Sequence, residues 1–326
     1  MRRRDFVALF GAAGAAAARP AAVRAQEAGR KYRIAALTPS PRGAPTTKAM
    51  FDELREFGFV EGQNLTIDHR AYGQRIELLS KYAEELFGTP ADVIVAAGDP
   101  AIRAAQAATK TTPILAITDD MVGSGFVSSL AKPTANTTGV SMLSADLDGK
   151  RQEILKEAVP GIRRMAALAD VNTTGSQQLQ EMQNAARTRE FELAIYPVAK
   201  QDEIVPAIDA AKKSNADALN VLASPLFFAN RQTIIERVAA LRLPAMYQWP
   251  ELAEEGGFLA YGPRLVAIFR DTMARQLVKL LRGASPADVP IEQPTKFELV
   301  INMKAAQGLG VQVSRSMQLL ADDVIE

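Results

Sequence analysis

Asp92–Ala105 reads DVIVAAGDPAIRAA, and this stretch decides the fold. Its apolar run, bounded by turn residues, is typical of a buried strand, and Asp99 before Pro100 predicts a helix with Asp99 as its N-cap. A strand that enters a helix through a tight glycine turn leaves free backbone N–H groups at its carboxyl end, where open α/β sheets bind small ligands. The alternative is a capped helix that binds no ligand.

The same unit occurs a second time in the chain. Ala216–Pro225 matches Ala91–Pro100 without a gap, with Ser224 as the predicted cap. Arg164–Leu168 likewise repeats the pattern of Arg33–Leu37. Because strands separated by helices of this length indicate βαβ units, we predict an α/β protein of two doubly wound parallel-sheet lobes joined by a hinge.

Hydrophobic periodicity and turn signals place the individual elements. Strands are expected at 33–37, 65–69, 93–95, 114–118, 136–140, 164–168, 191–196, within the repeat unit 216–225, and at 245–247, 258–261 and 297–301. Helices are expected at 46–57, 76–87, from 100 onward, 177–189, 202–214, 266–281 and 303–309. The tail after 262 does not form a third repeat, so we expect it to cross back to the first lobe and return. Lobe 1 is then 31–141 plus about 263–289, and lobe 2 is 142–262 plus about 290–326.

The composition is that of an ordinary globular protein. The 326 residues are 48% apolar and 23% charged, and the formal net charge is +1. This charge balance gives no electrostatic case for nucleic-acid binding. The sequence contains no cysteine, which excludes disulfides, a thiolate nucleophile and a Cys-ligated zinc.

Residues 1–26 have the organisation of an export signal peptide. Arg2–Arg4 form a basic start, an apolar stretch runs to Ala18, and small residues up to Ala25 precede Gln26. The Arg-Arg-x-Phe-Val order within it resembles a twin-arginine (Tat) signal. The apolar stretch is too short to span a bilayer, so we expect a soluble periplasmic protein from which the signal is removed.

Four patches carry a resemblance to a known family. They are Phe57–Asn64 (FGFVEGQN), Asp92–Pro100, Asn136–Val140 (NTTGV) and Glu292–Asn302 (EQPTKFELVIN). Together they resemble substrate-binding proteins of ABC importers, of the tryptophan/tyrosine-type family with a type I periplasmic binding fold. The resemblance implies capture of a small-molecule ligand between the lobes and its delivery to an ABC permease in the inner membrane. We expect a monomer that needs no cofactor and no metal.

The loops that follow the strands supply the candidate ligand-binding residues, since a ligand held between two such lobes lies at their carboxyl ends. The candidates are Ser40, Arg42, Tyr72, Gly98, Asp99, Asp119, Asn172, Ser224, Tyr247, Trp249 and Tyr261. Asp119 suits an ammonium group, or is a solvated turn residue. Arg42 suits an anion, or is solvated. Trp249 could stack on a planar ligand or pack between the lobes.

The sequence shows few of the residues and motifs that are typical of enzyme active sites. His69 is the sole histidine, it lies in a predicted strand at an exposed or edge position, and no G-x-S-x-G, Walker or G-x-G-x-x-G motif occurs. We therefore predict no catalytic residues and a transport protein that binds an amino acid or an aromatic or organic carboxylate. A periplasmic sensor that reports to a receptor and a transcription-factor-type sensor core remain the alternatives.

Overall fold

The structure, a computed structural model, describes residues 29–73, 75–133 and 135–326. The predicted export signal at 1–26 lies outside the described residues. Lys31–Glu326 forms one compact unit. Within the described ranges, no helix has the length and apolar character needed to cross a membrane.

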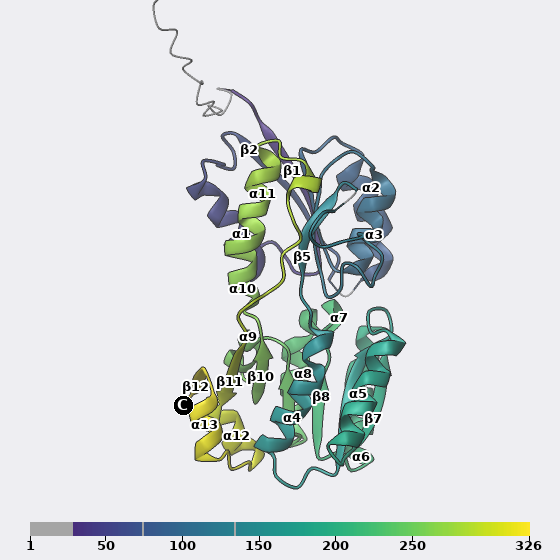
Figure 1. Ribbon diagram of the computed structural model, residues 1–326, viewed down its shortest axis with the longest axis vertical. Coiled ribbons are helices and arrows are strands. Elements are labelled where there is room, and N and C mark those ends of the chain that lie inside the picture. The colour runs from purple at the N-terminus through teal and green to yellow at the C-terminus, as the bar shows by residue number, and fades with distance from the viewer. Residues whose placement is uncertain (1–28, 74, 134) are drawn as a thin grey trace, which may run out of the picture. The chain divides into compact units, whose positions relative to one another are not determined.

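The first sheet has five strands in the order β2-β1-β3-β4-β5, and all of its neighbouring pairs are parallel. Helix α1 covers one face, while α2 and α3 cover the other, so the core lies in two layers around the sheet (Figure 1). The elements are β1 (Tyr32–Thr38), α1 (Pro45–Glu56), β2 (Leu65–Ala71), η1 (Ile76–Leu78), α2 (Leu79–Phe87), β3 (Val93–Ala97), α3 (Asp99–Ala108), β4 (Ile114–Thr118) and β5 (Thr137–Ser141).

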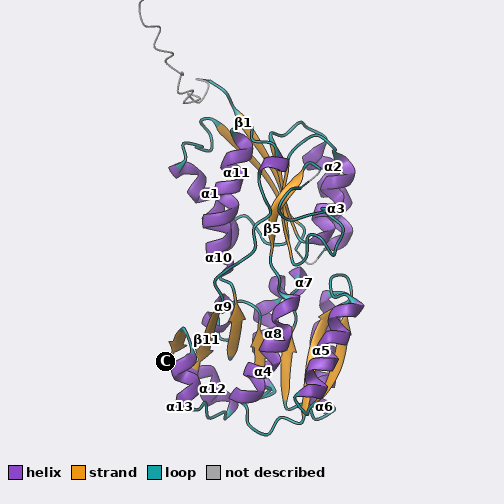
Figure 2. Ribbon diagram, viewed as in Figure 1, coloured by secondary structure: helices purple, strands orange, loops and turns teal. Residues whose placement is uncertain are grey.

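The second sheet has seven strands in the order β12-β11-β10-β9-β8-β6-β7, with helices on both faces (Figure 2). All of its neighbouring pairs are parallel except β10–β11. Its strands are β6 (Arg164–Asp170), β7 (Glu192–Val198), β8 (Ala218–Val221), β9 (Ala245–Tyr247), β10 (Leu259–Gly262), β11 (Glu298–Asn302) and β12 (Asp323–Ile325). Its helices are α4 (Asp148–Ala158), α5 (Ser176–Thr188), η3 (Gln201–Glu203), α6 (Ile204–Lys213), α7 (Pro225–Ala229), α8 (Arg231–Ala240), α9 (Pro250–Glu254), α12 (Met303–Leu309) and α13 (Arg315–Leu320).

Three crossings join the two sheets, at 142–147 (with η2, Ala145–Leu147), 263–264 and 289–297. After β10 the chain returns to pack on α1 through α10 (Leu265–Ala267), a π-helical stretch η4 (Ile268–Met273) and α11 (Ala274–Leu281). It then passes through η5 (Pro286–Asp288) and pairs with β5 at Glu292 before it enters β11. The α/β class with two mostly parallel sheets is therefore confirmed, whereas the lobe limits stay predictions.

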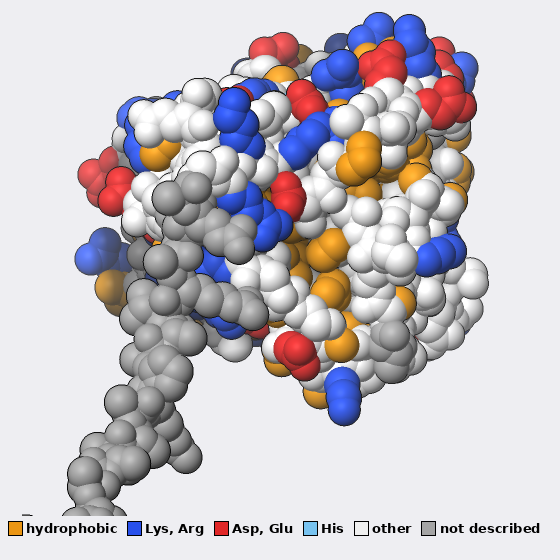
Figure 3. All heavy atoms as spheres, turned by 90° about the horizontal axis from the view of Figure 1, so that it is seen from above, with side chains coloured by type: hydrophobic (Ala, Val, Ile, Leu, Met, Phe, Trp, Pro, Cys, Tyr) orange, Lys and Arg blue, Asp and Glu red, His pale blue; other side chains and the backbone are white. Residues whose placement is uncertain are grey.

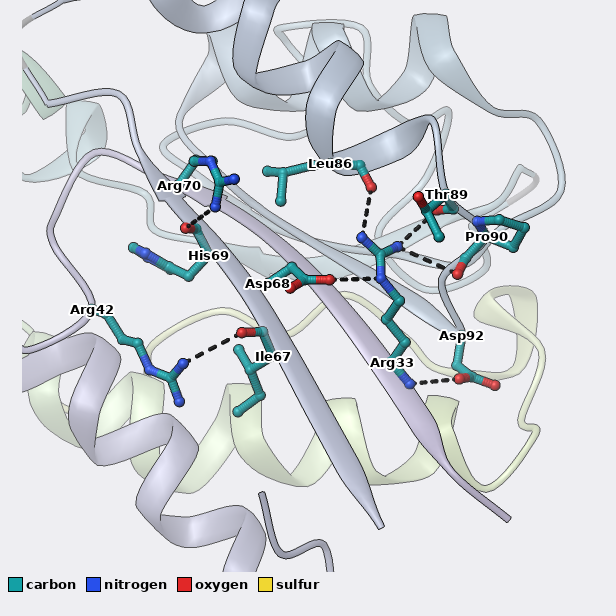
Figure 4. A network of polar contacts seen from close by, with 10 residues as sticks. All are labelled: Arg33, Arg42, Ile67, Asp68, His69, Arg70, Leu86, Thr89, Pro90 and Asp92. Atoms are coloured by element: carbon teal, nitrogen blue, oxygen red, sulfur yellow. Dashed lines mark hydrogen bonds and ion pairs between the residues drawn. The ribbon is translucent and has the colours of Figure 1, made fainter. Parts of the chain in front are cut away.

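Arg33 joins several chain segments by hydrogen bonds at the amino ends of the strands of the first sheet. Its guanidinium donates to Asp68 on β2 and to the carbonyls of Thr89 and Leu86, while its backbone N–H donates to Asp92 (Figure 4).

The face seen from above in Figure 3 mixes Lys and Arg with Asp and Glu, unlike the single-sign stripe of a nucleic-acid footprint.

Candidate ligand-binding site

A cavity of about 550 Å³ is lined by the loops that follow the strands of both sheets. The first sheet contributes residues after β1, β3 and β4, and the second contributes residues after β6, β8 and β9. Residues of α10 and η4 complete the wall. The size is typical of a site for a small organic molecule.

Six of the eleven candidates line this cavity: Ser40, Gly98, Asp99, Asp119, Ser224 and Trp249. The other five, Arg42, Tyr72, Asn172, Tyr247 and Tyr261, are not among its lining residues. Tyr72 and Asn172 lie beside it, at a small gap between Pro100 and Pro225. Tyr247 is fully buried in the core of the second sheet.

Arg42 has its contacts outside the cavity lining. Its guanidinium donates to the Ile67 carbonyl of β2 (Figure 4). It also pairs with Glu61 and lies over the Phe51 ring of α1. Because the positive charge of the Arg42 guanidinium is already paired with Glu61, it is not free to pair with an anionic ligand.

Asp99 is not the N-cap that the sequence predicts. Gly98 takes the N-cap position with φ of +84°, and Asp99 is the first helical residue of α3. Its carboxylate accepts hydrogen bonds from the hydroxyls of Thr118 and Ser124 instead of capping the helix. The shift arises because glycine adopts the positive φ of the turn without strain, so the helix begins one residue earlier.

Ser224 is the N-cap of α7, as predicted. Its hydroxyl oxygen accepts from the N–H groups of Leu226 and Phe227 at 2.9 and 3.3 Å. The same hydroxyl donates to Asp170 at the end of β6, at 2.6 Å. Ser224 therefore satisfies this helix end without a ligand.

Gly98 lies where a loop of the first sheet meets a loop of the second sheet. A Cβ atom at Gly98 would lie 2.6 Å from the Tyr72 hydroxyl and 3.0 Å from Cγ of Pro225. The Tyr72 hydroxyl donates to the Ala97 carbonyl at 2.9 Å, and its pKa is raised by burial and then by the charges of Asp99 and Asp170. The approach of Pro225 therefore requires a residue without a side chain at position 98.

Replacing Gly98 with alanine is expected to weaken ligand affinity about tenfold. The added Cβ would strain a positive-φ position and push Pro225 outward, together about 1–2 kcal/mol against the arrangement seen here. Isothermal titration of Gly98→Ala beside Gly161→Ala checks this. Gly161 also has positive φ, at 93°, but nothing lies within 4 Å of a Cβ there. Equal affinity of Gly98→Ala and the parent would contradict the expectation.

Asp119 follows β4 and faces the cavity as a partly exposed carboxyl. Its carboxyl accepts a hydrogen bond from the Ser144 N–H, at 3.2 Å. Burial raises the pKa of Asp119 to about 6, and Asp148 adds to the rise, while Ser144 and Arg151 oppose it. A cationic group in the cavity would therefore stabilise the ionised form of the Asp119 carboxyl.

Behind Asp119 lies an ion pair that the sequence reading missed. Arg151 and Asp148 are 0% and 1% exposed, and Nη1 of Arg151 lies 3.0 Å from the Asp148 carboxylate. Arg151 also donates to the Ser144 carbonyl at 2.7 Å and to the Tyr261 carbonyl at 2.9 Å. It thereby ties the first crossing to the strand that precedes the second.

The same cluster reaches the cavity through Gln178. This lining residue of α5 donates to the second carboxylate oxygen of Asp148 at 2.7 Å. Burial raises the pKa of Asp148 although Arg151 opposes the rise. Asp119, Asp148 and Arg151 together hold two acids against one guanidinium, so the ionised cluster carries one surplus negative charge.

The charge of the cavity wall is one-sided. Its lining includes the carboxyl groups of Asp99, Asp119, Asp120, Asp146 and Glu181 and, within the described part of the chain, no Lys, Arg or His. The apolar part of the wall comes from Met142, Phe228, Trp249, Leu265 and Phe269. Trp249 packs edge-on against Phe228 with ring centroids 5.3 Å apart. Such a wall suits a ligand with a cationic group and an apolar body.

His69 does not line the cavity but contacts Thr38, which does. It lies on the edge strand β2, as predicted, and its Nε2 is 2.9 Å from the Thr38 hydroxyl. The single Thr38 hydroxyl hydrogen is directed at the Ser40 carbonyl, 2.8 Å away, so His69 Nε2 must carry the proton and donate. Burial, with Arg42 and Arg70, lowers the pKa of His69 to about 4, and the ring therefore stays neutral at physiological pH.

A sequence model of the family described as ABC transporter substrate binding protein matches residues 38–325. The chain belongs to this family. The resemblance drawn from the four sequence patches is thus confirmed. A search of curated proteins gives no match for this substrate-binding protein.

Solved structures share the fold of this substrate-binding protein. A conserved domain protein from Vibrio cholerae is 23% identical with a TM-score of 0.81, covering 90% of this chain and 99% of the other. An ABC domain from Streptococcus pneumonia in complex with L-Trp is 24% identical with a TM-score of 0.81, covering 90% and 100%. A ligand-free, open substrate-binding protein with adhesive properties from Clostridium difficile is 22% identical with a TM-score of 0.63, covering 91% and 99%.

Several lining residues escaped the sequence reading: Thr46, Thr47, Asp146, Gln178, Phe228 and Phe269. Thr46 and Thr47 follow Pro45, whose place at the start of a helix was a usable signal. Phe269 comes from a helix that reaches the cavity only through the second crossing. Within the described residues, no group of three or more His, Cys, Asp or Glu side chains could hold a metal ion.

Proposed function

We propose that this protein is the solute-binding component of an ABC importer and captures an amino acid with an apolar side chain. The observation that carries the proposal is the cavity itself, whose wall combines carboxyl groups, apolar side chains and no basic residue in the described part of the chain. A carboxylate without an amine would meet five acidic residues and no cation to pair with. An amino acid brings an ammonium group for Asp119 and an apolar body for Trp249 and Phe228.

Capture proceeds by closure of two lobes around the ligand. The ligand first contacts one sheet's loops, and the other lobe then closes until Pro225 meets Gly98. A ligand favours this form only through contacts that the open form lacks. The residues from the two sheets that line one cavity, such as Asp119 and Trp249, supply such contacts. The closed protein presents its solute to a permease in the inner membrane.

We further propose that the predicted export signal in residues 1–26 directs the protein to the periplasm, where this activity takes place. Family membership supports a partner permease, since an ABC transporter substrate-binding protein serves a membrane transporter. We further propose that the protein acts as a monomer, because each chain supplies both halves of the cavity wall.

A thermal-shift screen of L-amino acids tests the proposal. Saturation of the site at about 100 times Kd adds about 2.7 kcal/mol to the free energy of unfolding, which raises Tm by several degrees. Benzoate and a neutral sugar serve as ligands that lack an amine. A hit can be confirmed by the fluorescence of Trp249, the single tryptophan, which lines the cavity. If no amino acid raised Tm, or if benzoate did so more strongly, the amino-acid assignment would fail.

A further inference from the structure

The amino-terminal end of α1 opens on the cavity and has no cap of its own. Ala44 is its N-cap residue and offers no side-chain hydrogen bond, while Pro45 has no N–H. Thr46 and Thr47 line the cavity, and their backbone N–H groups find no acceptor among the described residues. Unpaired N–H groups at a helix end are completed by a partner from outside the helix, such as a side chain, water or a ligand.

Three unpartnered hydroxyl groups lie at the same place. Ser40, Thr46 and Thr47 are 8%, 5% and 1% exposed, and all three line the cavity. No described residue gives any of these three hydroxyls a hydrogen bond. These residues are more than nine-tenths buried, yet their hydroxyls have no partner among the described residues on the wall of the cavity, and a ligand group at this spot would supply one.

Other helices that start at the cavity have already satisfied or exposed their ends. The first N–H groups of α7 bond to the Ser224 hydroxyl, and α3 carries the Asp99 carboxylate in its own first turn. The start of α5 at Gly175 is solvent-exposed, so water can serve it. By comparison, the first turn of α1, where Thr46 and Thr47 are buried, still lacks an acceptor for its N–H groups among the described residues.

The loop before α1 is held in place for this role. The hydrogen-bond chain from His69 through Thr38 ends on the Ser40 carbonyl, which fixes the backbone that carries the Ser40 hydroxyl. His69 also packs edge-on against Phe51 of α1, with ring centroids 6.3 Å apart. The sole histidine is thus a positioning residue for this end of the cavity.

We propose that the amino end of α1, with Ser40, Thr46 and Thr47, binds the carboxylate of the ligand through neutral donors alone. Two backbone N–H groups and three hydroxyls supply enough donors for both carboxylate oxygens, and the helix dipole favours a negative charge there. Because five acidic side chains line the same cavity, a singly charged carboxylate is accepted and a doubly charged phosphate is disfavoured. This assignment rests on the proposed function and names the second anchor of that same site.

The test compares acids with their primary amides. The probes are L-tryptophan, L-tyrosine, L-phenylalanine and L-leucine and the four corresponding amides, titrated calorimetrically into the full protein. We expect the parent to bind the best acid at least tenfold more tightly than its amide. Thr47→Val and Ser40→Ala should each weaken the acid roughly tenfold but leave the amide nearly unchanged. Thr66→Val, an exposed threonine of β2 outside the cavity, is the matched control and should change neither affinity.

Stability separates this role from a structural one. Thr47→Val replaces an unpaired buried hydroxyl by a methyl group of the same size, so Tm of the ligand-free protein should stay equal or rise. A drop in Tm together with equal losses for acid and amide would show a packing role and overturn the proposal. Equal binding of acid and amide by the parent would also overturn it, while leaving the proposed function intact. If neither these eight probes nor any other L-amino acid of the thermal-shift screen binds, the proposed function fails instead.

Discussion

Replacing Arg151 with methionine is expected to lower the free energy of unfolding by about 3–5 kcal/mol. The guanidinium is fully buried and bonds to the Ser144 carbonyl, the Tyr261 carbonyl and the Asp148 carboxylate. Without it, Asp148 would be a buried carboxyl with no cation, and two carbonyls near the crossings would lose their donor. Chemical denaturation of the ligand-free protein measures the loss.

Lys150→Met is the matched control, because Lys150 pairs with Glu153 on the same helix. Both members of this pair are solvated, with the Lys150 and Glu153 side chains 50% and 43% exposed, so the pair contributes about 0–1 kcal/mol. Asp148→Asn in the Arg151→Met background should recover part of the stability, since it removes the uncompensated charge. A loss no greater than that of Lys150→Met would show that the buried pair is not what holds this region together.

Replacing Asp119 with asparagine is expected to weaken an amino-acid ligand by about 2 kcal/mol, roughly 30-fold in Kd. The variant keeps the size of the side chain and removes the charge that faces the ammonium group. Calorimetric titration of the parent and Asp119→Asn with the best ligand of the screen checks this. Asp323→Asn, an exposed position on the edge strand β12, is the control and should bind like the parent. If Asp119→Asn bound as tightly as the parent, Asp119 would not be the ammonium partner.

The pH dependence follows from the same carboxyl. Its pKa of about 6 in the folded protein lies above the ordinary value of 3.8, so the folded state binds more protons than the unfolded state between those pH values. Stability of the ligand-free protein therefore falls as pH rises from about 4 through about 6, and Asp119→Asn removes this fall. Binding of an ammonium group shows the opposite trend in the parent, because it needs the ionised carboxylate and weakens below pH about 6. A parent whose affinity were flat from pH 5 to 8 would contradict this.

Local chemistry in the sequence was enough to predict most elements of the fold. Neighbouring residues alone predict the apolar run of β3, its repeat at β8 and the Ser224 cap. The structure contains all three features. The reading failed by one residue at Asp99, where the positive φ of Gly98 moved the helix start. It also gave one continuous helix at 266–281, where the structure has a π-helical stretch.

The residues of the candidate site also divide into those that could be predicted from the sequence and those that could not. Positions directly after a strand, such as Asp119 and Trp249, were accessible to sequence reasoning because strand ends of a parallel sheet meet at one edge. Arg42 also follows a strand, but its charge is taken by Glu61, a partner that no local pattern reveals. Whether a loop residue faces a ligand depends on such distant competitors.

The α/β class, the paired strand–turn–helix units and the family could be predicted from the amino-acid sequence, since these depend on periodicity, caps and turns within a few residues. The burial of Arg151 against Asp148 and the lack of partners among the described residues for Thr46 and Thr47 at an open helix end depend on the tertiary packing. Burial and the pairing of polar groups depend on what the rest of the chain brings near them. The free energy of a charge or hydroxyl is therefore set by contacts between segments that are far apart in the sequence.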